Sequence, residues 1–131
     1  MPVLSSVLLV DDDQTANFLH KLLLTNMQLT GHVLVAENGQ QALDLLAQAS
    51  LVPALILLDV NMPVLNGFEF LARYGAELSA AATRPVVALL SSSDQALEQA
   101  RAQQLPVDAF LTKPLTREKL QALLLQHFPA A

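Results

Sequence analysis

The sequence predicts a doubly wound α/β fold, in which a five-stranded parallel sheet carries helices on both faces. Short apolar runs alternate with stretches of helical period along the whole chain, an order typical of parallel sheets with crossover helices. Of the residues, 53% are hydrophobic and only 5% are aromatic, so the core must be mainly aliphatic. The 131 residues suit one domain, and we expect a single domain over residues 1–131.

The first strand and helix are separated by a run of three aspartates. The strand is predicted over residues 7–10, and Asp13, the last of the aspartates, suits the N-cap of the helix that follows. Helical spacing predicts an inward face that consists of Ala16, Leu19, Leu23 and Met27.

The remaining elements continue the alternation. Further strands are predicted over residues 32–36, 54–58, 86–90 and 109–112. The strand at 54–58 is apolar without alternation, as expected for a central strand that is buried on both faces. Further helices are predicted over residues 40–49, from 68 to about 78, from the serines at 91–93 to about 104, and after Thr116 as the N-cap.

Charge and composition exclude several classes of function. The net charge is −5 and the basic residues are scattered, so direct binding to nucleic acid is not expected. The absence of cysteine excludes disulfides and thiolate metal sites. No apolar run is long enough to insert into a membrane and no leader pattern is visible, so we expect a cytoplasmic protein.

Polar residues occur where four of the predicted strands end. Asp11 and Asp12 follow the first strand, Asp59 follows the third, Ser91 the fourth and Lys113 the fifth. In a doubly wound sheet the carboxyl ends of the strands border the functional crevice, so these side chains should converge there.

Carboxylates that converge in this way need a nearby cation because they repel one another. Mg²⁺ suits hard oxygen ligands and is usually held by one or two carboxylates plus a phosphate, a requirement that Asp12 and Asp59 can meet. Asp59 could then act as a carboxylate nucleophile toward a phosphoryl group. The Lys113 ammonium would neutralise charge on the transferred oxygens, and the Ser91 hydroxyl would supply a hydrogen bond.

Four segments together resemble the successive signatures of response-regulator receiver domains: LLVDDDQT, LILLDVNMPVLNGFEFL, VVALLSSS and FLTKPLT. The resemblance covers the whole chain and implies a flavodoxin-like (βα)5 sandwich with strand order 2-1-3-4-5. It implies that Asp59 is the phosphoacceptor and that the Lys113–Pro114 peptide is cis. It also implies an Mg²⁺ site formed by the side chains of Asp12 and Asp59, the backbone carbonyl of Asn61 and, through water, Asp11.

The resemblance further implies a conformational switch that couples Ser91 to Phe110. Phosphorylation would draw the hydroxyl inward and change the rotamer of the ring, which remodels the face made by the fourth helix, the fifth strand and the fifth helix. Phe110 stands where the family frequently has Tyr, so its switch would be steric. Ser92 is an alternative to Ser91. Asn61 and Ser93 are expected to tune the lifetime of the phosphoryl group.

The expected partners follow from the same resemblance. A sensor histidine kinase or a histidine phosphotransfer protein would donate the phosphoryl group, and a downstream protein would receive the signal, because we expect no output domain. The chain would be a monomer or a phosphorylation-dependent dimer, and a switch rather than a turnover enzyme.

Three other functions stay open at this point. A flavin carrier shares the strand order, but the three aspartates would repel a flavin phosphate. An aspartyl phosphohydrolase would use Asp11 and Asp13, which leaves Asp59 unexplained. A pseudo-receiver would act without phosphorylation. The histidines have no metal-ligand spacing, and no role is predicted for them; they are His20, His32 and His127.

Overall fold

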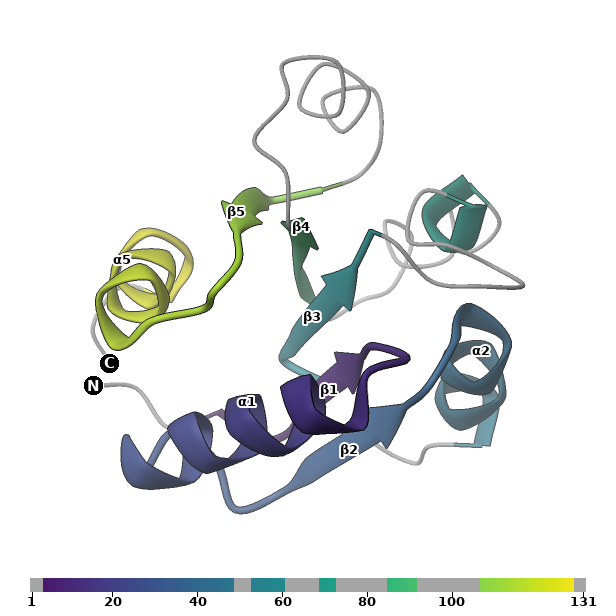
Figure 1. Cartoon of the computed structure of the whole chain (residues 1–131), viewed down its shortest axis with the longest axis horizontal. Helices are drawn as coiled ribbons and strands as arrows, with labels where there is room; N and C mark the ends of the chain where they lie inside the picture. The colour runs from purple at the N-terminus through teal and green to yellow at the C-terminus, as the bar shows by residue number, and fades with distance from the viewer. Residues whose placement is uncertain (1–3, 49–52, 61–68, 73–84, 92–106, 129–131) are drawn as a thin grey trace.

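A computed structural model describes residues 4–48, 53–60, 69–72, 85–91 and 107–128 of the chain. Its centre is a five-stranded parallel sheet with the strand order β2-β1-β3-β4-β5 (Figure 1). The strands are β1 (Val7–Val10), β2 (Val33–Ala36), β3 (Leu55–Asp59), β4 (Val86–Ser91) and β5 (Ala109–Thr112). The predicted order and all five strands are confirmed. β3 and β4 each continue one residue beyond the prediction, so that Asp59 and Ser91 are the last residues of their strands.

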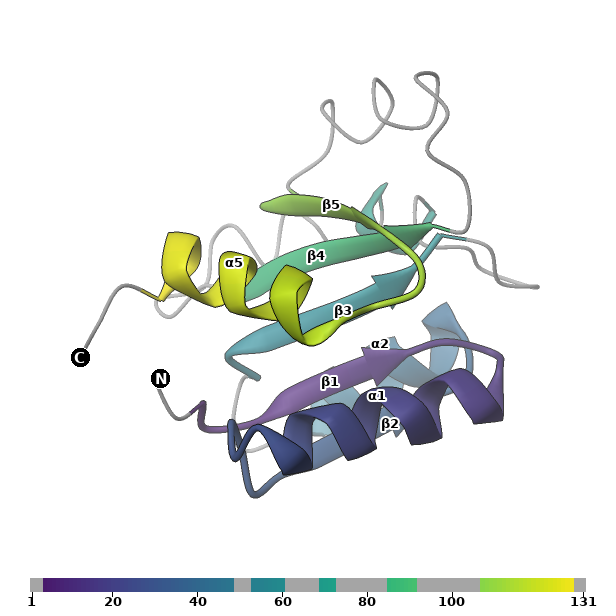
Figure 2. The ribbon, with the colours of Figure 1, turned by 60° about the vertical axis from the view of Figure 1, so that its left-hand side comes forward.

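Helices cover both faces of this sheet, as predicted. Within the described residues, the helices whose two ends are both given are α1 (Gln14–Asn26), α2 (Gly39–Gln48) and α5 (Arg117–His127). α1 and α5 lie on one face, and α2 lies on the other (Figure 2). Of the helix predicted from 68 to about 78, residues 69–72 are helical and the rest lies outside the described residues. The helix predicted between the serines at 91–93 and about residue 104 also lies outside them. α2 begins at Gly39, one residue before the start of the helix predicted over residues 40–49.

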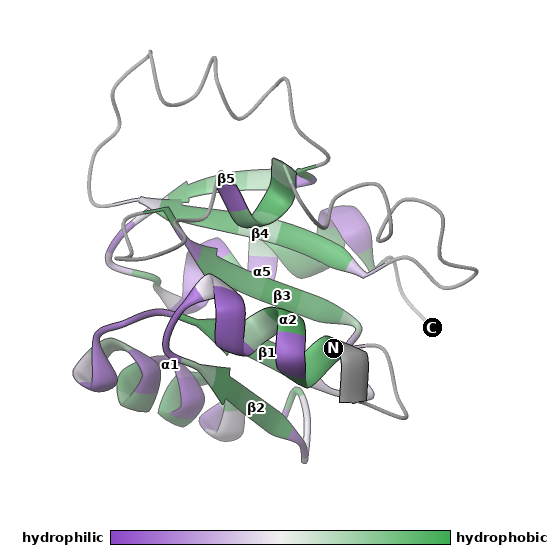
Figure 3. Ribbon diagram, turned by 90° about the vertical axis from the view of Figure 1, so that its right-hand side faces the viewer, coloured by the Kyte–Doolittle hydropathy of each residue, from purple (hydrophilic) through white to green (hydrophobic). Residues whose placement is uncertain are grey.

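The alternation of side chains along the strands divides the core into two layers. Leu8, Ile56 and Val87 pack toward α2. Their neighbours Leu9, Leu57 and Ala88 pack toward α1 and α5. In Figure 3 the strands are hydrophobic along their length, whereas α1 and α2 carry both hydrophobic and hydrophilic bands. Both faces of the central strands are therefore buried, which explains their unbroken apolar sequences.

The predicted caps of α1 and α5 are confirmed. The Asp13 carboxylate accepts hydrogen bonds from the N–H groups of Thr15 and Ala16, at 2.9 and 3.4 Å. The Thr116 hydroxyl accepts one from the N–H of Lys119 at 3.2 Å. Because each cap satisfies backbone donors that would otherwise be unpaired, both helices begin at defined residues beside the C-terminal edge of the sheet.

The predicted inward face of α1 is partly wrong. Met27 is buried and Leu23 is half-buried, but Leu19 is 53% exposed. The buried positions of the helix are Asn17, His20 and Leu24. Two polar side chains therefore occupy the inward stripe, and apolar residues stand outside it, so hydrophobicity alone indicated the wrong orientation.

None of the helices in the described ranges combines the length and the apolar character that crossing a membrane requires.

The orientation of α1 can be tested with two leucine substitutions. Leu24→Ala should lower the free energy of unfolding by about 2–5 kcal/mol, because it removes a fully buried side chain from the core. Leu19→Ala should lower it by no more than about 1 kcal/mol. Urea unfolding of both variants measures the difference, and a larger loss for Leu19→Ala would contradict the observed orientation.

Candidate functional site

The parallel register of β1 and β3 places two carboxylates side by side. Val10 pairs with Leu58, and the next residues along each strand are Asp11 and Asp59. Asp12 follows directly on the loop after β1, and oxygens of the three carboxylates lie within 4.8 Å of one another. Asp11 and Asp59 are 2% and 5% exposed, whereas Asp12 is exposed. The cluster thus has a buried base and an open side.

Asp11 is held at four atoms. Its N–H donates to the carbonyl of Ala36 at 3.0 Å, and its own carbonyl accepts from Asn17 Nδ2 at 2.8 Å. Its carboxylate accepts from the N–H of Asp13 at 2.9 Å and from Lys113 Nζ at 2.8 Å. Three of these four contacts come from β2, α1 and the loop after β5, so the tertiary structure sets the position of Asp11.

Lys113 reaches both buried carboxylates. Its Nζ lies 2.8 Å from Asp11 Oδ2 and 3.4 Å from Asp59 Oδ1. Burial lowers the pKa of Lys113, but the hydrogen bond to Asp11 and the charges of Asp59 and Asp11 outweigh this effect, so that the pKa is raised above its ordinary value. The ammonium therefore stays charged at neutral pH.

The end of β5 is joined to the end of β4 beside this lysine. The N–H of Lys113 donates to the carbonyl of Ser91 at 2.7 Å. The Lys113–Pro114 peptide is cis, as the resemblance implied. The loop that carries Lys113 is thus hydrogen-bonded to the strand that carries Ser91.

The carboxylate cluster fits a hard divalent cation. Three carboxylates face one ammonium, and the remaining negative charge is repulsive at these separations unless a cation neutralises it. All the donors are carboxylate oxygens, which Mg²⁺ prefers, and the exposure of Asp12 leaves room for water and a phosphate. Asn61, the predicted carbonyl ligand, lies outside the described residues.

Ser91 and Phe110 share one face of the sheet. Leu89 pairs with Phe110 and Ser91 with Thr112, so Ser91 and Phe110 are diagonal neighbours across β4 and β5. Phe110 packs against the cluster of the α2 face, and Ser91 follows Leu89 of that cluster by two residues. Ser91 is fully buried. The arrangement allows the predicted coupling of the two residues; Ser92 and Ser93 lie outside the described residues.

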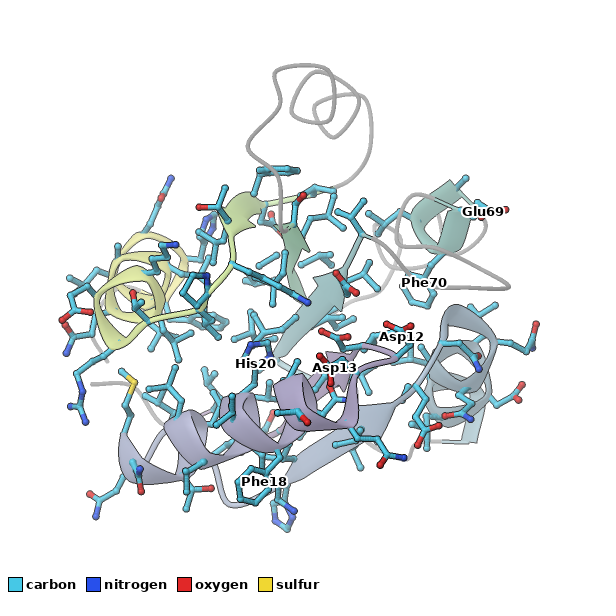
Figure 4. All side chains as sticks on the ribbon, in the orientation of Figure 1. Asp12, Asp13, Phe18, His20, Glu69 and Phe70 are labelled. Carbon is cyan, nitrogen blue, oxygen red and sulfur yellow. The ribbon has the colours of Figure 1, made fainter. Side chains whose placement is uncertain are left out.

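His20, for which the sequence predicted no role, lies beside the carboxylate cluster. Figure 4 shows its ring on the sheet side of α1, with Phe18 on the opposite side. The pKa of His20 is lowered by burial and then by the charge of Lys113, while Asp11 and Asp13 oppose this shift. The spacing of Asn17, His20 and Leu24 along one helical stripe was the signal that could have located it.

Asp13 has a structural position, which weakens the phosphohydrolase interpretation. Its carboxylate caps α1, and the third carboxylate of the cluster comes from Asp59 instead. The cluster therefore contains Asp59, which has no role in the phosphohydrolase interpretation, and does not contain Asp13, which that interpretation requires.

Comparison with known proteins agrees with this geometry. A family model described as the response regulator receiver domain matches residues 7–125. The chain is 36% identical over 120 residues to the transcriptional regulatory protein CpxR of Escherichia coli strain K12. The aligned region covers 91% of this chain and 47% of CpxR. This chain thus spans about half the length of that relative.

Solved structures show the same architecture. A two-component response regulator from Cytophaga hutchinsonii superposes with a TM-score of 0.87 at 30% identity, over 98% of this chain and 99% of that chain. The fold also occurs in the receiver domain of Saccharomyces cerevisiae Ssk1, whose structure was solved together with the histidine phosphotransfer protein Ypd1. That match has 22% identity and a TM-score of 0.80, and it covers 96% of this chain and 89% of that chain. Since the family model extends over nearly the whole sequence and contains every strand of the sheet, the chain belongs to the response regulator receiver domain family of two-component systems.

Proposed function

We propose that this chain is a phosphoacceptor switch, in which Asp59 accepts a phosphoryl group from the phosphohistidine of a sensor histidine kinase or a histidine phosphotransfer protein. The observation that carries the proposal is the position of the Asp59 carboxylate. It is nearly buried, it lies 3.4 Å from Lys113 Nζ, and it belongs to the cluster that includes Asp11 and Asp12. A nucleophile, a paired cation and an oxygen-ligand site thus meet at one point.

The residues of the chain would divide the work of transfer among them. A carboxylate oxygen of Asp59 attacks phosphorus, an O–P bond forms as the N–P bond breaks, and the imidazole nitrogen of the donor leaves with the electron pair. Lys113 neutralises charge that spreads over the transferred oxygens, and the contacts of Asp11 keep that ammonium in place. Mg²⁺ held by Asp11, Asp12, Asp59 and the carbonyl of Asn61 would supply further positive charge to the same oxygens.

The signal would leave the site through Ser91 and Phe110. Ser91 would hydrogen-bond the phosphoryl group, and the space that its movement opens would change the preferred rotamer of Phe110, as a shift between two existing populations. Their diagonal placement on one face supports this coupling. The output surface would include β5 and α5, together with a fourth helix that would lie outside the described residues.

The partners are also proposals. The complex of Ssk1 with Ypd1 supports a histidine phosphotransfer protein as the donor, and a downstream protein would read the output face. We propose a switch rather than a turnover enzyme, located in the cytoplasm, as a monomer or a phosphorylation-dependent dimer. A pseudo-receiver that acts without phosphorylation is the alternative.

Phosphorylation of Asp59 gives the most direct test. With Mg²⁺ and acetyl phosphate, the chain should gain one phosphoryl group by intact mass, because the activated donor replaces the partner. Asp59→Asn should gain none, since an amide cannot form the acyl phosphate. Asp44→Asn, the same substitution at an exposed position of α2, should behave as the wild type. A wild type that gains no phosphoryl group, or an Asp59→Asn variant that gains one, would favour the pseudo-receiver.

Removal of a cluster carboxylate tests the metal site. Asp12→Asn should weaken Mg²⁺ binding about tenfold or more, measured by calorimetry or by NMR titration, because it takes away one charged ligand of a cluster of three. Asp13→Asn is the control, since asparagine also caps helices well and residue 13 points toward α1. Equal affinities for the two variants would argue against Asp12 as a ligand.

A further inference from the structure

We propose that Lys119 is a positioning residue for phosphoryl transfer, because it binds the main chain on both sides of Lys113 and thereby sets where the Lys113 ammonium lies. The inference rests on the proposed function in one respect, namely that Lys113 acts on the transferred phosphoryl group. The placement of Lys113 by Lys119 is a separate claim about geometry and can be measured without any phosphoryl donor.

Three oxygens surround the Lys119 ammonium. Nζ lies 2.6 Å from the carbonyl of Thr112, 3.1 Å from the carbonyl of Pro114 and 3.3 Å from the Thr112 hydroxyl. The two carbonyls belong to the residues immediately before and after Lys113. Hydrogen bonds from a charged donor are stronger than neutral ones, so the ammonium holds this stretch of backbone from both ends.

The position of Lys119 on its helix is not explained by helix stability. It is the third residue of α5, within the first turn, where the helix dipole favours acidic side chains and disfavours a positive charge. The N–H of Lys119 donates to the Thr116 hydroxyl, and this hydrogen bond also fixes the backbone from which the Lys119 side chain extends. A lysine at this place is therefore better explained by the three oxygens that its ammonium binds.

The position of the Lys113 ammonium depends on this attachment, because a long side chain can be placed only if the backbone that carries it is fixed. Its backbone N–H is bound to the carbonyl of Ser91, and with Lys119 on the flanking carbonyls the starting point of the side chain has little freedom. From there the ammonium reaches Asp11 at 2.8 Å and Asp59 at 3.4 Å. If the backbone of residues 112–114 moved, the longer contact to Asp59 would be lost first, and that contact adjoins the reacting carboxylate.

The experiment compares Lys119→Met with Lys119→Arg and with the control Lys21→Met. Methionine removes the ammonium but keeps much of the aliphatic side chain, arginine restores a cationic donor, and Lys21 is an exposed lysine of α1. Three quantities are measured at a temperature where urea unfolding shows each variant folded: the NMR signal of the Lys113 ammonium, the affinity for Mg²⁺, and the rate of phosphorylation by acetyl phosphate at saturating Mg²⁺.

Lys119→Met should broaden or shift the Lys113 ammonium signal and slow phosphorylation about ten- to a hundredfold, as expected for a misplaced charged group. Its Mg²⁺ affinity should not fall, because all three carboxylates remain and Asp59 loses only a competing positive charge. Lys119→Arg should recover most of the rate, and Lys21→Met should match the wild type. A general loss of structure would instead weaken Mg²⁺ binding in parallel with the rate.

An unchanged Lys113 signal together with an unchanged rate in Lys119→Met would overturn the inference, as would a rate that falls only in proportion to Mg²⁺ affinity. If Lys119→Met does not fold, Lys119→Gln, which keeps an amide donor, is compared with Lys119→Arg by the same three measurements. A wild type that is never phosphorylated would refute the proposed function. The Lys113 ammonium signal would then still decide whether Lys119 places Lys113.

Discussion

The ion pair between Lys113 and Asp11 allows two carboxylates to be buried side by side at the edge of the sheet. Asp11 directly follows β1 and Asp59 ends the neighbouring strand β3, and the parallel register brings them side by side. Removing two like charges from water is costly unless each is paired. Lys113 contacts both carboxylates, and the open side at Asp12 suits a metal ion. The negative charge that the strand register brings together is thus partly matched by the ammonium and is suited to a cation.

Helices α1 and α5 contribute to this site through main-chain contacts. Asn17 of α1 binds the carbonyl of Asp11, and Lys119 of α5 binds the carbonyls on either side of Lys113. Each helix therefore holds one member of the ion pair. The buried Oδ1 of Asn17 has no hydrogen-bond partner in the part of the chain that the structure describes, which is unfavourable for stability. A polar residue at this position is better explained by its contact with Asp11 than by packing.

The two faces of the sheet carry different groups of candidate site residues. Asp11, Asp59 and Lys113 each lie two residues beyond a side chain of the layer that α1 and α5 cover, and the charges of Lys113 and Asp11 act on His20 of α1. Ser91 and Phe110 belong to the opposite side, against the layer of α2. In the proposed switch, a change at Asp59 would therefore have to pass through the ends of the strands to reach Phe110. The hydrogen bond from the N–H of Lys113 to the carbonyl of Ser91 is one direct connection between the two sides.

The sequence by itself determined the strands, the convergence of Asp11, Asp12, Asp59 and Lys113, and the caps at Asp13 and Thr116. These features depend on local patterns, on alternation and on the rule that parallel strands end at a common edge. Only the tertiary structure decided the orientation of α1, with Leu19 outside and His20 inside, and the contacts of Lys119. These depend on which oxygens of distant segments come within reach of a side chain, and hydrophobic periodicity carries no information about such contacts.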